Sequence, residues 1–212
     1  MAEIRVNTQS SIMISGTKTL YFDPWKLSAN APKADVIFVT HDHFDHYSAQ
    51  DIKNIMDENT VLVAPEKMIA DVIEKTGAKK EKCIAAVPEK DYEANGIKFR
   101  TVPAYNKAKP FHKKSDGWCG YIAQLDGKCY YVLGDTDATN EAKSVSCDVM
   151  LIPVGGTYTM DVNEASELVC TVRPETAVPT HYGDVVGSPD DGKTFKKLVQ
   201  AKCPEINVEV IL

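Results

Sequence analysis

The chain has 212 residues, of which 43% are hydrophobic and 25% are charged, and its formal net charge is −6. This length suits a single domain with a full core or two small halves packed together, and the ordinary composition favours neither a disordered nor a fibrous protein. The acidic balance argues against a large nucleic-acid-binding surface, which is normally basic. No apolar run is long enough to span a bilayer and the first residues lack the features of a signal peptide, so we expect a cytoplasmic protein.

Six cysteines are scattered along the chain without a Cys-x-x-Cys pair. Most of them lie in apolar surroundings, where a reduced thiol packs as a small hydrophobic group. We therefore expect free thiols, and we keep a disulfide framework or a thiolate metal site as the less favoured alternative.

The chain opens with three short segments in which apolar and polar residues alternate, a pattern typical of β-strands. The predicted strands are 3–7, 11–15 and 19–22. Pro24 stops the third strand and leaves Asp23 at a strand end. A further run of apolar, β-branched residues at 35–40 predicts a buried strand.

Directly after this run, three histidines and two aspartates fall within six residues. They are His41, Asp42, His43, Asp45 and His46. Crowded imidazoles and carboxylates stay unsatisfied unless a cation lies among them, so the cluster predicts a metal site. Its place after a strand fits, because ligand loops of α/β proteins usually lie at the carboxyl ends of strands. Residues two apart in extended backbone point to the same side, so His41 and His43 can share one ion while Asp45 and His46 face a second.

The rest of the chain alternates predicted strands and helices. The strands are 60–64, 84–87, 97–103, 120–125, 130–133, 149–153, 176–179 and 207–212. Helices are expected to begin at Ser48, at Pro65 and near Asp161, and a last helix spans 194–201. Asn95-Gly96 is a strong turn signal and is predicted to join the strands 84–87 and 97–103.

The pattern His41-x-His43-x-Asp45-His46 resembles the signature of the metallo-β-lactamase superfamily of metal-dependent hydrolases. The resemblance implies an α/β fold, namely an αββα sandwich of two mixed β-sheets flanked by helices, with one or two metal ions at the sheet edge. It covers nearly the whole chain, so we expect one domain over 1–212. Four short segments resemble the corresponding sequences of the small hydrolases grouped with the bacterial ascorbate-6-phosphate lactonases. They are 103–106, 111–112, 134–137 and 153–158.

The resemblance also implies roles for residues outside the cluster. Asp135 follows an apolar strand and matches the superfamily's aspartate that bridges two metals. His181 closes another strand and matches the final histidine, a ligand of the second metal. Asp23 would accept hydrogen bonds and orient the metal-binding loop, with a simple Asp-Pro turn as the alternative.

One ligand of the first metal is left open. Asn106 stands where the superfamily usually has a histidine, and an amide is a poor zinc ligand. Either His112 folds in from the loop and completes the site of His41 and His43, or Asn106 holds a water there and the first site is weak or empty. We favour His112, which makes every histidine of the chain a ligand.

These residues predict metal-assisted hydrolysis. Zinc is the expected metal, as one or two ions, with manganese or iron as alternatives. Asp135 would bridge the ions, and Asp45 would also accept a proton during catalysis. A non-hydrolytic metal-binding sensor, or a redox protein that holds iron in the same cage, is the competing hypothesis from a different class of protein.

Lysines around the loop of His112 favour a small anionic substrate, with a phosphodiester or a lactone as the first choice and an ester or thioester next. Lys107, Lys109 and Tyr158 are the candidates for binding it, although surface lysines often have no such role. We expect a small-molecule substrate as the partner, and neither nucleic acid nor membrane. A homo-oligomer remains open.

Overall fold

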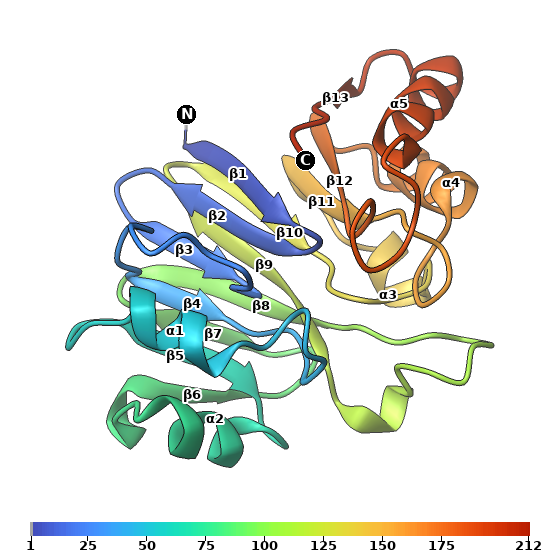
Figure 1. The fold of residues 1–212 in the computed structure, drawn as a ribbon. Coiled ribbons are helices and arrows are strands. Elements are labelled where there is room, and N and C mark those ends of the chain that lie inside the picture. The colour runs from blue at the N-terminus through green and yellow to red at the C-terminus, as the bar shows by residue number, and fades with distance from the viewer. Residues whose placement is uncertain (1) are drawn as a thin grey trace.

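The computed structural model describes residues 2–212, and within them thirteen β-strands form two sheets (Figure 1). The first sheet contains β1 (Glu3–Thr8), β2 (Ser11–Ser15), β3 (Thr19–Phe22), β4 (Val36–Phe38), β5 (Val61–Pro65) and β6 (Cys83–Ala86). The second contains β7 (Asp91–Ala94), β8 (Ile97–Pro103), β9 (Cys119–Leu125), β10 (Lys128–Val132), β11 (Val149–Pro153), β12 (Thr176–Thr180) and β13 (Asn207–Val208).

Both sheets are mixed and follow the same plan. Strands β1 to β3 are antiparallel and β3 to β6 are parallel. In the second sheet β7 to β10 are antiparallel and β10 to β13 are parallel. Parallel strands need crossover connections, and these connections carry the helices to the outer faces.

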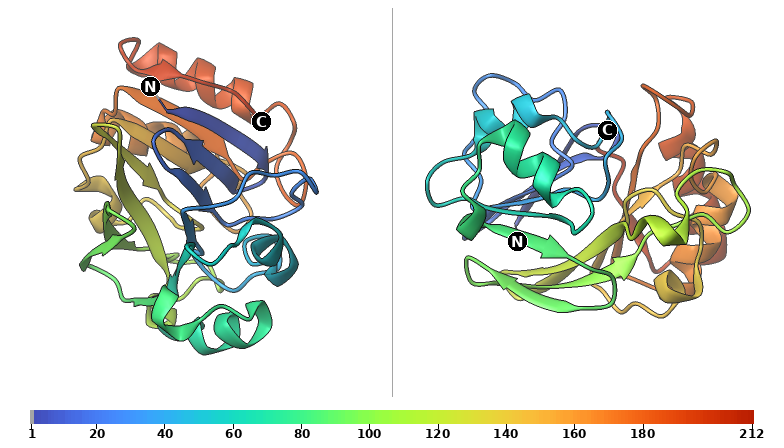
Figure 2. Two further views of the ribbon diagram at one scale, coloured as in Figure 1. Left: turned by 90° about the vertical axis from the view of Figure 1, so that its left-hand side faces the viewer. Right: turned by 90° about the horizontal axis from the view of Figure 1, so that it is seen from below.

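The α-helices within the described residues are α1 (Ala49–Ile55), α2 (Ile69–Thr76), α3 (Asn140–Lys143), α4 (Val162–Val172) and α5 (Asp191–Lys202), and two short 3-10 helices cover Lys80–Lys82 and Lys114–Asp116. Helices α1 and α2 pack on the first sheet, and α3, α4 and α5 on the second, so the layers follow the order expected for an αββα sandwich (Figure 2). Within residues 2–212, no helix has both the length and the apolar character that a bilayer crossing requires.

Aromatic side chains fill the space between the two sheets. Phe38 of β4 stacks on Phe22 at 4.7 Å between ring centroids, and it meets Tyr121 at 5.0 Å and Phe99 at 5.1 Å. All four side chains are buried. Because burial of one such side chain stabilises a fold by about 1.5–3 kcal/mol, this contact is a principal link between the sheets.

The structure corrects the predicted start of the second helix. Pro65 is the last residue of β5, where it pairs with Ala86 of β6, and α2 begins only at Ile69. The parallel pairing with β6 extends the strand, and the end of a strand tolerates a residue without an N–H group. Gly77 ends α2 in the left-handed conformation, which glycine adopts without steric cost.

The predicted hairpin between 84–87 and 97–103 is also wrong. Asn95 and Gly96 form the turn between β7 and β8, both with positive φ, whereas β6 lies in the other sheet. The short polar strand β7 and the single-turn helix α3 carry too weak a pattern to be predicted. At the C-terminus, α5 begins three residues before the predicted 194, and the strand predicted at 207–212 is reduced to β13. All six cysteines are free, in agreement with the prediction of reduced thiols.

Candidate metal centre

Four loops bring the candidate ligands to one edge of the sandwich, and each loop follows the carboxyl end of a strand. The β4–α1 loop carries His41, His43, Asp45 and His46, the β8–β9 loop carries His112, and Asp135 and His181 follow β10 and β12. All of them except His43 are buried, with at most 6% of the surface exposed. Seven side chains predicted from sequence as metal ligands therefore lie together.

The first group of side chains comprises His41, His43, His112 and Asp135. Nε2 of His41 lies 3.2 Å from Nδ1 of His43. Nε2 of His112 lies 3.3 Å from Oδ2 of Asp135, and Nε2 of His41 lies 4.0 Å from the same oxygen. One ion can reach all four side chains, because the ligand atoms lie within 4.8 Å of one another.

The second group comprises Asp45, His46 and His181. Oδ2 of Asp45 lies 3.4 Å from Nε2 of His181 and 3.7 Å from Nε2 of His46. Both of these imidazole nitrogens lie 3.3 Å from Oδ1 of Asp135. The two carboxylate oxygens of Asp135 thus face different groups, Oδ2 the first and Oδ1 the second.

The inward-pointing nitrogen and oxygen atoms of the centre are better placed to coordinate a metal ion than to form hydrogen bonds with one another. Nε2 of His46, His112 and His181 and Oδ1 of Asp135 are buried and have no hydrogen-bond partner. Unpaired buried polar atoms are rare in proteins because each costs free energy. Imidazole nitrogens and carboxylate oxygens are also ligands that zinc and other transition metals accept, so these residues suit a metal ion.

The charges of the centre favour a cation. Burial raises the pKa of Asp135, but the imidazoles of His181 and His46 lower it well below its usual range, so this carboxylate is ionised. Burial and His46 lower the pKa of His41 well below 6.5, so this imidazole is neutral. Burial opposes the charge on His46 too, but Asp135 and Asp23 raise its pKa to about 9. A metal ion would therefore displace a proton from His46.

Asp23 orients one histidine of each group. Its Oδ2 accepts hydrogen bonds from Nδ1 of His46 and from Oγ1 of Thr40, both at 2.7 Å. Because the Thr40 hydroxyl donates to Asp23, it accepts from Nδ1 of His41, 2.9 Å away. Both imidazoles then carry their proton on Nδ1 and turn Nε2 towards the centre. The structure thus gives Asp23 contacts that a simple Asp-Pro turn does not require.

Asn106 lies behind His112 and outside the group of ligand atoms. Its backbone N–H donates to the carbonyl of His112 at 2.8 Å, and its Nδ2 lies 3.1 Å from Nδ1 of that ring. The same Nδ2 donates to the carbonyl of Tyr158 at 2.8 Å. The structure thus places Nε2 of His112 among the ligand atoms of the first group and leaves Asn106 outside them.

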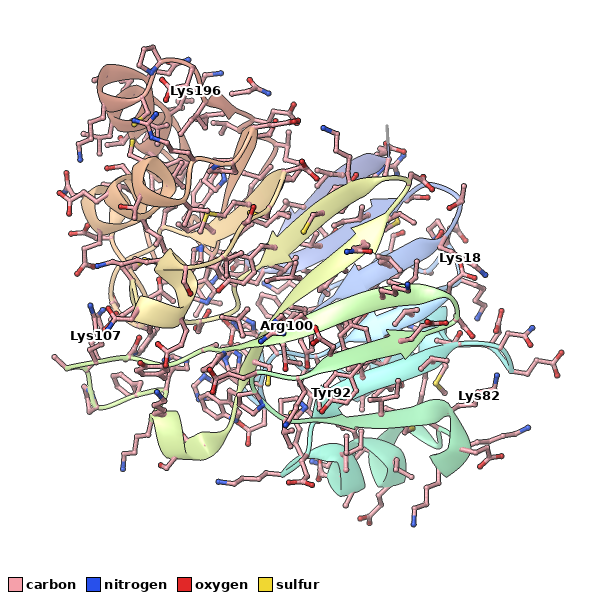
Figure 3. All side chains as sticks on the ribbon, turned by 180° about the vertical axis from the view of Figure 1, so that it is seen from behind. Lys18, Lys82, Tyr92, Arg100, Lys107 and Lys196 are labelled. Atoms are coloured by element: carbon pink, nitrogen blue, oxygen red, sulfur yellow. The ribbon has the colours of Figure 1, made fainter. Side chains whose placement is uncertain are left out.

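The lysines predicted to bind substrate are engaged within the protein. Nζ of Lys107 donates to the carbonyl of Ala138 at 3.0 Å, and Lys109 forms an ion pair with Asp137. Lys107 lies on the long β8–β9 loop that projects from the sandwich (Figure 3). The structure therefore does not place either ammonium group among the ligands, and the pairing with Asp137 reduces the positive charge on which the prediction of an anionic substrate depended.

Two residues that support the site were not found from the sequence. The ring of Trp118 lies 4.8 to 5.3 Å from the rings of His41, His43 and His112, and forms a wall of the first group. The backbone carbonyl of Gln9, in the β1–β2 turn, accepts the N–H of His181 at 2.9 Å. Neither position has a local sequence signal, since each acts through contacts with distant segments.

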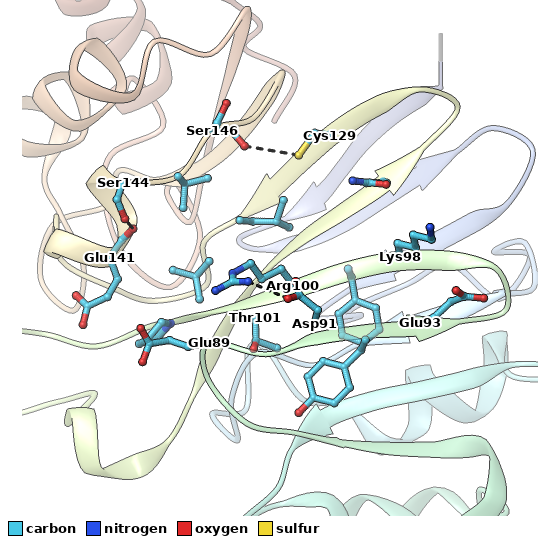
Figure 4. Close-up of a pocket in the computed structure, with 17 residues that line it drawn as sticks. Glu89, Asp91, Glu93, Lys98, Arg100, Thr101, Cys129, Glu141, Ser144 and Ser146 are labelled. Carbon is cyan, nitrogen blue, oxygen red and sulfur yellow. Dashed lines mark hydrogen bonds and ion pairs between the residues drawn. The ribbon is translucent and has the colours of Figure 1, made fainter.

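A separate hollow lies away from the ligands. A cavity of about 880 Å³ lies on the outer face of β7 to β10, where Arg100 pairs with Asp91 at 2.9 Å (Figure 4). Arg100 alternates along β8 with Phe99, which points into the core between the sheets. None of the candidate metal ligands lines this cavity.

An αββα sandwich with histidines and aspartates gathered at the carboxyl ends of its strands is the arrangement of the metallo-β-lactamase fold, and its side chains suit a metal ion. A family model described as a beta-lactamase superfamily domain matches residues 3–181. The chain is 32% identical over 220 residues to a UPF0173 metal-dependent hydrolase of Pyrococcus abyssi, covering 95% of this chain and 94% of that protein. It is 28% identical over 209 residues to another UPF0173 metal-dependent hydrolase, from Pelotomaculum thermopropionicum, covering 91% and 89%.

A solved structure shares the whole fold. A protein of Parabacteroides distasonis described as a metal-dependent hydrolase superposes with a TM-score of 0.82 at 27% identity, covering 99% of this chain and 92% of that one. The chain therefore belongs to the beta-lactamase superfamily and is a metal-dependent hydrolase.

Proposed function

We propose that the chain holds two metal ions and uses them to hydrolyse a small-molecule ester bond. The proposal rests on the orientation of the Asp135 carboxylate, whose two oxygens face different groups of side chains. Oδ2 lies 3.3 Å from Nε2 of His112, and Oδ1 lies 3.3 Å from Nε2 of both His46 and His181. A carboxylate in this position can bridge two ions. The first would be held by His41, His43 and His112, and the second by Asp45, His46 and His181.

The donor set supports zinc as the metal. Five imidazoles and two carboxylates make up the two groups, and no cysteine takes part in either. Imidazole nitrogen together with carboxylate oxygen suits zinc, and also iron or manganese. Metal ions bound here would supply Lewis-acid activation of a water molecule and of the substrate oxygen that gains negative charge.

Asp45 is the residue proposed to move the proton. Burial raises its pKa, but hydrogen bonding to His181 and the charge of His46 lower it below the usual range, so the carboxylate is ionised and can accept a proton. The oxygen of the attacking water forms a bond to the carbonyl carbon or phosphorus, and the bond to the leaving oxygen breaks. The proton taken by Asp45 from the water is then available to the leaving oxygen, which balances the reaction.

The class of bond is a further part of the proposal. A lactone or a phosphodiester is the first choice, from the resemblance to the ascorbate-6-phosphate lactonase group, followed by an open ester or a thioester. The net charge of −6 supports a small molecule over a nucleic acid as the substrate.

Metal analysis combined with turnover tests this proposal. We expect purified wild type to contain about two ions per chain, and Asp135→Ala to lose metal and hydrolysis together, because removal of a bridging ligand weakens both sites. The substrates would be γ-butyrolactone, 4-nitrophenyl butyrate and bis(4-nitrophenyl) phosphate. Hydrolysis by a metal-free preparation would refute the mechanism, and iron-loaded protein with an absorption band and oxygen reactivity would favour a redox protein instead.

A further inference from the structure

Exposed apolar side chains gather on the loops that carry the ligands. Five large apolar side chains are strongly exposed among residues 2–212, and three of them lie on these loops. Phe44 is 66% exposed and stands between two candidate ligands in the β4–α1 loop. Phe111 is 44% exposed and directly precedes His112, and Val185 is 37% exposed and follows His181 by four residues. Single exposed apolar residues are ordinary, but three beside one reaction centre indicate a binding surface.

The two phenylalanines are held in place by other aromatic rings. Phe44 meets Trp25 edge to face, with 5.8 Å between ring centroids. Phe111 meets Tyr158 edge to face at 5.0 Å. Such pairs stabilise a fixed ring orientation by about 0.5–1.5 kcal/mol. The exposed faces are therefore ordered before any substrate binds, which reduces the entropy lost on binding.

Three lysines near these loops are already paired with carboxylates. Lys109 pairs with Asp137, and Nζ of Lys114 lies 2.6 Å from the carboxylate of Glu141. On the other side, Nζ of Lys26 lies 2.7 Å from Asp184 and 4.1 Å from the centre of the Trp25 ring. The surroundings of the centre thus offer apolar surface, whereas the charges of Lys26, Lys109 and Lys114 are neutralised by carboxylates of the protein itself.

From these contacts we infer that the substrate carries an uncharged aliphatic or aromatic group next to the bond that is cleaved, and that Phe44 and Phe111 bind this group. The inference rests on the proposed function and narrows it to neutral lactones and esters over phosphodiesters. Trp118, packed against three of the histidines, adds an apolar wall at the candidate ligands themselves. The scissile bond then lies at the ions while the apolar group extends between the two phenylalanines.

The test is a series of 4-nitrophenyl esters from acetate to octanoate, assayed with the zinc-loaded protein. Full burial of one methylene is worth about 0.8 kcal/mol, or about fourfold in affinity, so a surface that buries half of the chain gives about twofold in kcat/KM per methylene. Phe44→Ala and Phe111→Ala should each reduce the increase in kcat/KM per methylene. Phe44→Leu should keep most of that increase. Ile211→Ala, which removes an exposed apolar side chain on the C-terminal segment, is the matched control and should leave the dependence unchanged.

For one variant, the dependence of kcat/KM on acyl-chain length does not change with metal content, because partial loss of metal lowers the rate for every ester by the same factor. A second readout needs no turnover. The two tryptophans of the chain are Trp25, which contacts Phe44, and Trp118, which contacts His41. Titration with 1-octanol should therefore change the intrinsic fluorescence at lower concentration than titration with 1-butanol, and Phe111→Ala should remove this difference.

The outcomes separate this inference from the proposed function. Turnover of all esters at one rate would overturn the inference of an apolar binding surface, as would faster turnover of bis(4-nitrophenyl) phosphate than of the octanoate ester. The proposed function as a metal-dependent hydrolase would stand in both cases. Absence of turnover for every substrate in metal-loaded protein would refute the proposed function. The fluorescence titrations would then decide the apolar surface: octanol binding lost in Phe111→Ala supports it, and equal responses to both alcohols overturn it.

Discussion

The Asp23 carboxylate accepts a hydrogen bond from Nδ1 of His46 at 2.7 Å, and neither side chain has any exposed surface. Through the hydroxyl of Thr40 the same carboxylate also fixes His41, which belongs to the other group of ligands. A residue that is not itself a ligand therefore orients one imidazole for each proposed ion. This arrangement makes the effect of Asp23 on metal binding measurable at both sites.

Asp23→Asn should lower the affinity for metal at both sites by about 10- to 100-fold, while two ions still bind when metal is in excess. The amide keeps the shape of the side chain, and asparagine tolerates the left-handed backbone found at this position, where φ is 48°. Competition with a chelator of known affinity measures the effect.

Asp126→Asn is the matched control, because Asp126 also has positive φ, at 51°, and accepts hydrogen bonds from Thr17 in a turn. Its metal affinity should equal that of wild type. Equal affinity in Asp23→Asn and wild type would show that Asp23 serves only the turn.

His112 and Asn106 should differ in the kind of metal loss that they cause. His112→Ala removes a ligand atom and should reduce the metal content by about one ion per chain. Asn106→Ala removes only the amide next to Nδ1 of His112, 3.1 Å away, and should weaken binding at the first site by about tenfold without lowering the content at saturation.

Metal analysis at limiting and at excess zinc distinguishes the two variants. Unchanged metal content in His112→Ala, combined with the loss of one ion per chain in Asn106→Ala, would identify Asn106 as the ligand. A wild type with one ion would indicate that the first site is weak.

Six of the seven candidate ligands were predictable from the sequence because they closely follow apolar strands, whereas His112 was assigned as the only remaining histidine. The carboxyl ends of β4 in the first sheet and of β12 in the second meet at one edge of the sandwich, so His181, 135 residues after His46, is brought back beside it. The αββα fold followed from the resemblance and from the alternating pattern of strands and helices.

Features that depend on pairing between distant segments were not predictable. The strand β6 lies beside β5, whereas the nearby Asn95-Gly96 turn belongs to the other sheet, and nothing local distinguishes the two sheets. Lys109 has the sequence context of an anion-binding residue, but its partner Asp137 lies 28 residues away and is revealed only by the fold. The same holds for Trp118, which meets the histidines only through tertiary packing.

Gly134 should be indispensable for the position of Asp135. Its φ is +65°, and a Cβ atom there would lie 2.9 Å from the Cβ of Thr40, which is too close. Gly134→Ala should therefore combine backbone strain with overpacking and lower the free energy of unfolding by about 2–5 kcal/mol. It should also weaken metal binding, since Asp135 and the Thr40 loop are pushed apart.

Gly96→Ala separates the two causes. Gly96 also has positive φ, +81°, but no atom lies within 4 Å of the added Cβ, so only the strain of about 1 kcal/mol is expected, with unchanged metal affinity. Urea unfolding and chelator competition on both variants provide the comparison. Equal effects of the two substitutions would show that contact with Thr40 is unimportant.

The metal-free protein should be most stable near pH 6.5. The pKa of His41 lies well below 6.5 in the folded protein, so below that pH the unfolded chain binds protons first and stability falls. The pKa of His46 is raised from 6.5 to about 9 by Asp135 and Asp23 against the effect of burial, so its stabilisation is complete below pH 6.5 and is lost as the pH rises to about 9.

Saturating zinc should abolish the alkaline decline, because metal binding replaces the proton of His46 and becomes more favourable as the pH rises. His46→Gln should abolish the decline in the metal-free protein as well. Urea midpoints measured from about pH 5 to about pH 10, with a chelator and with zinc, test both statements. A chelated wild type whose midpoint stays level or rises between pH 6.5 and 9 would contradict the charged state of His46.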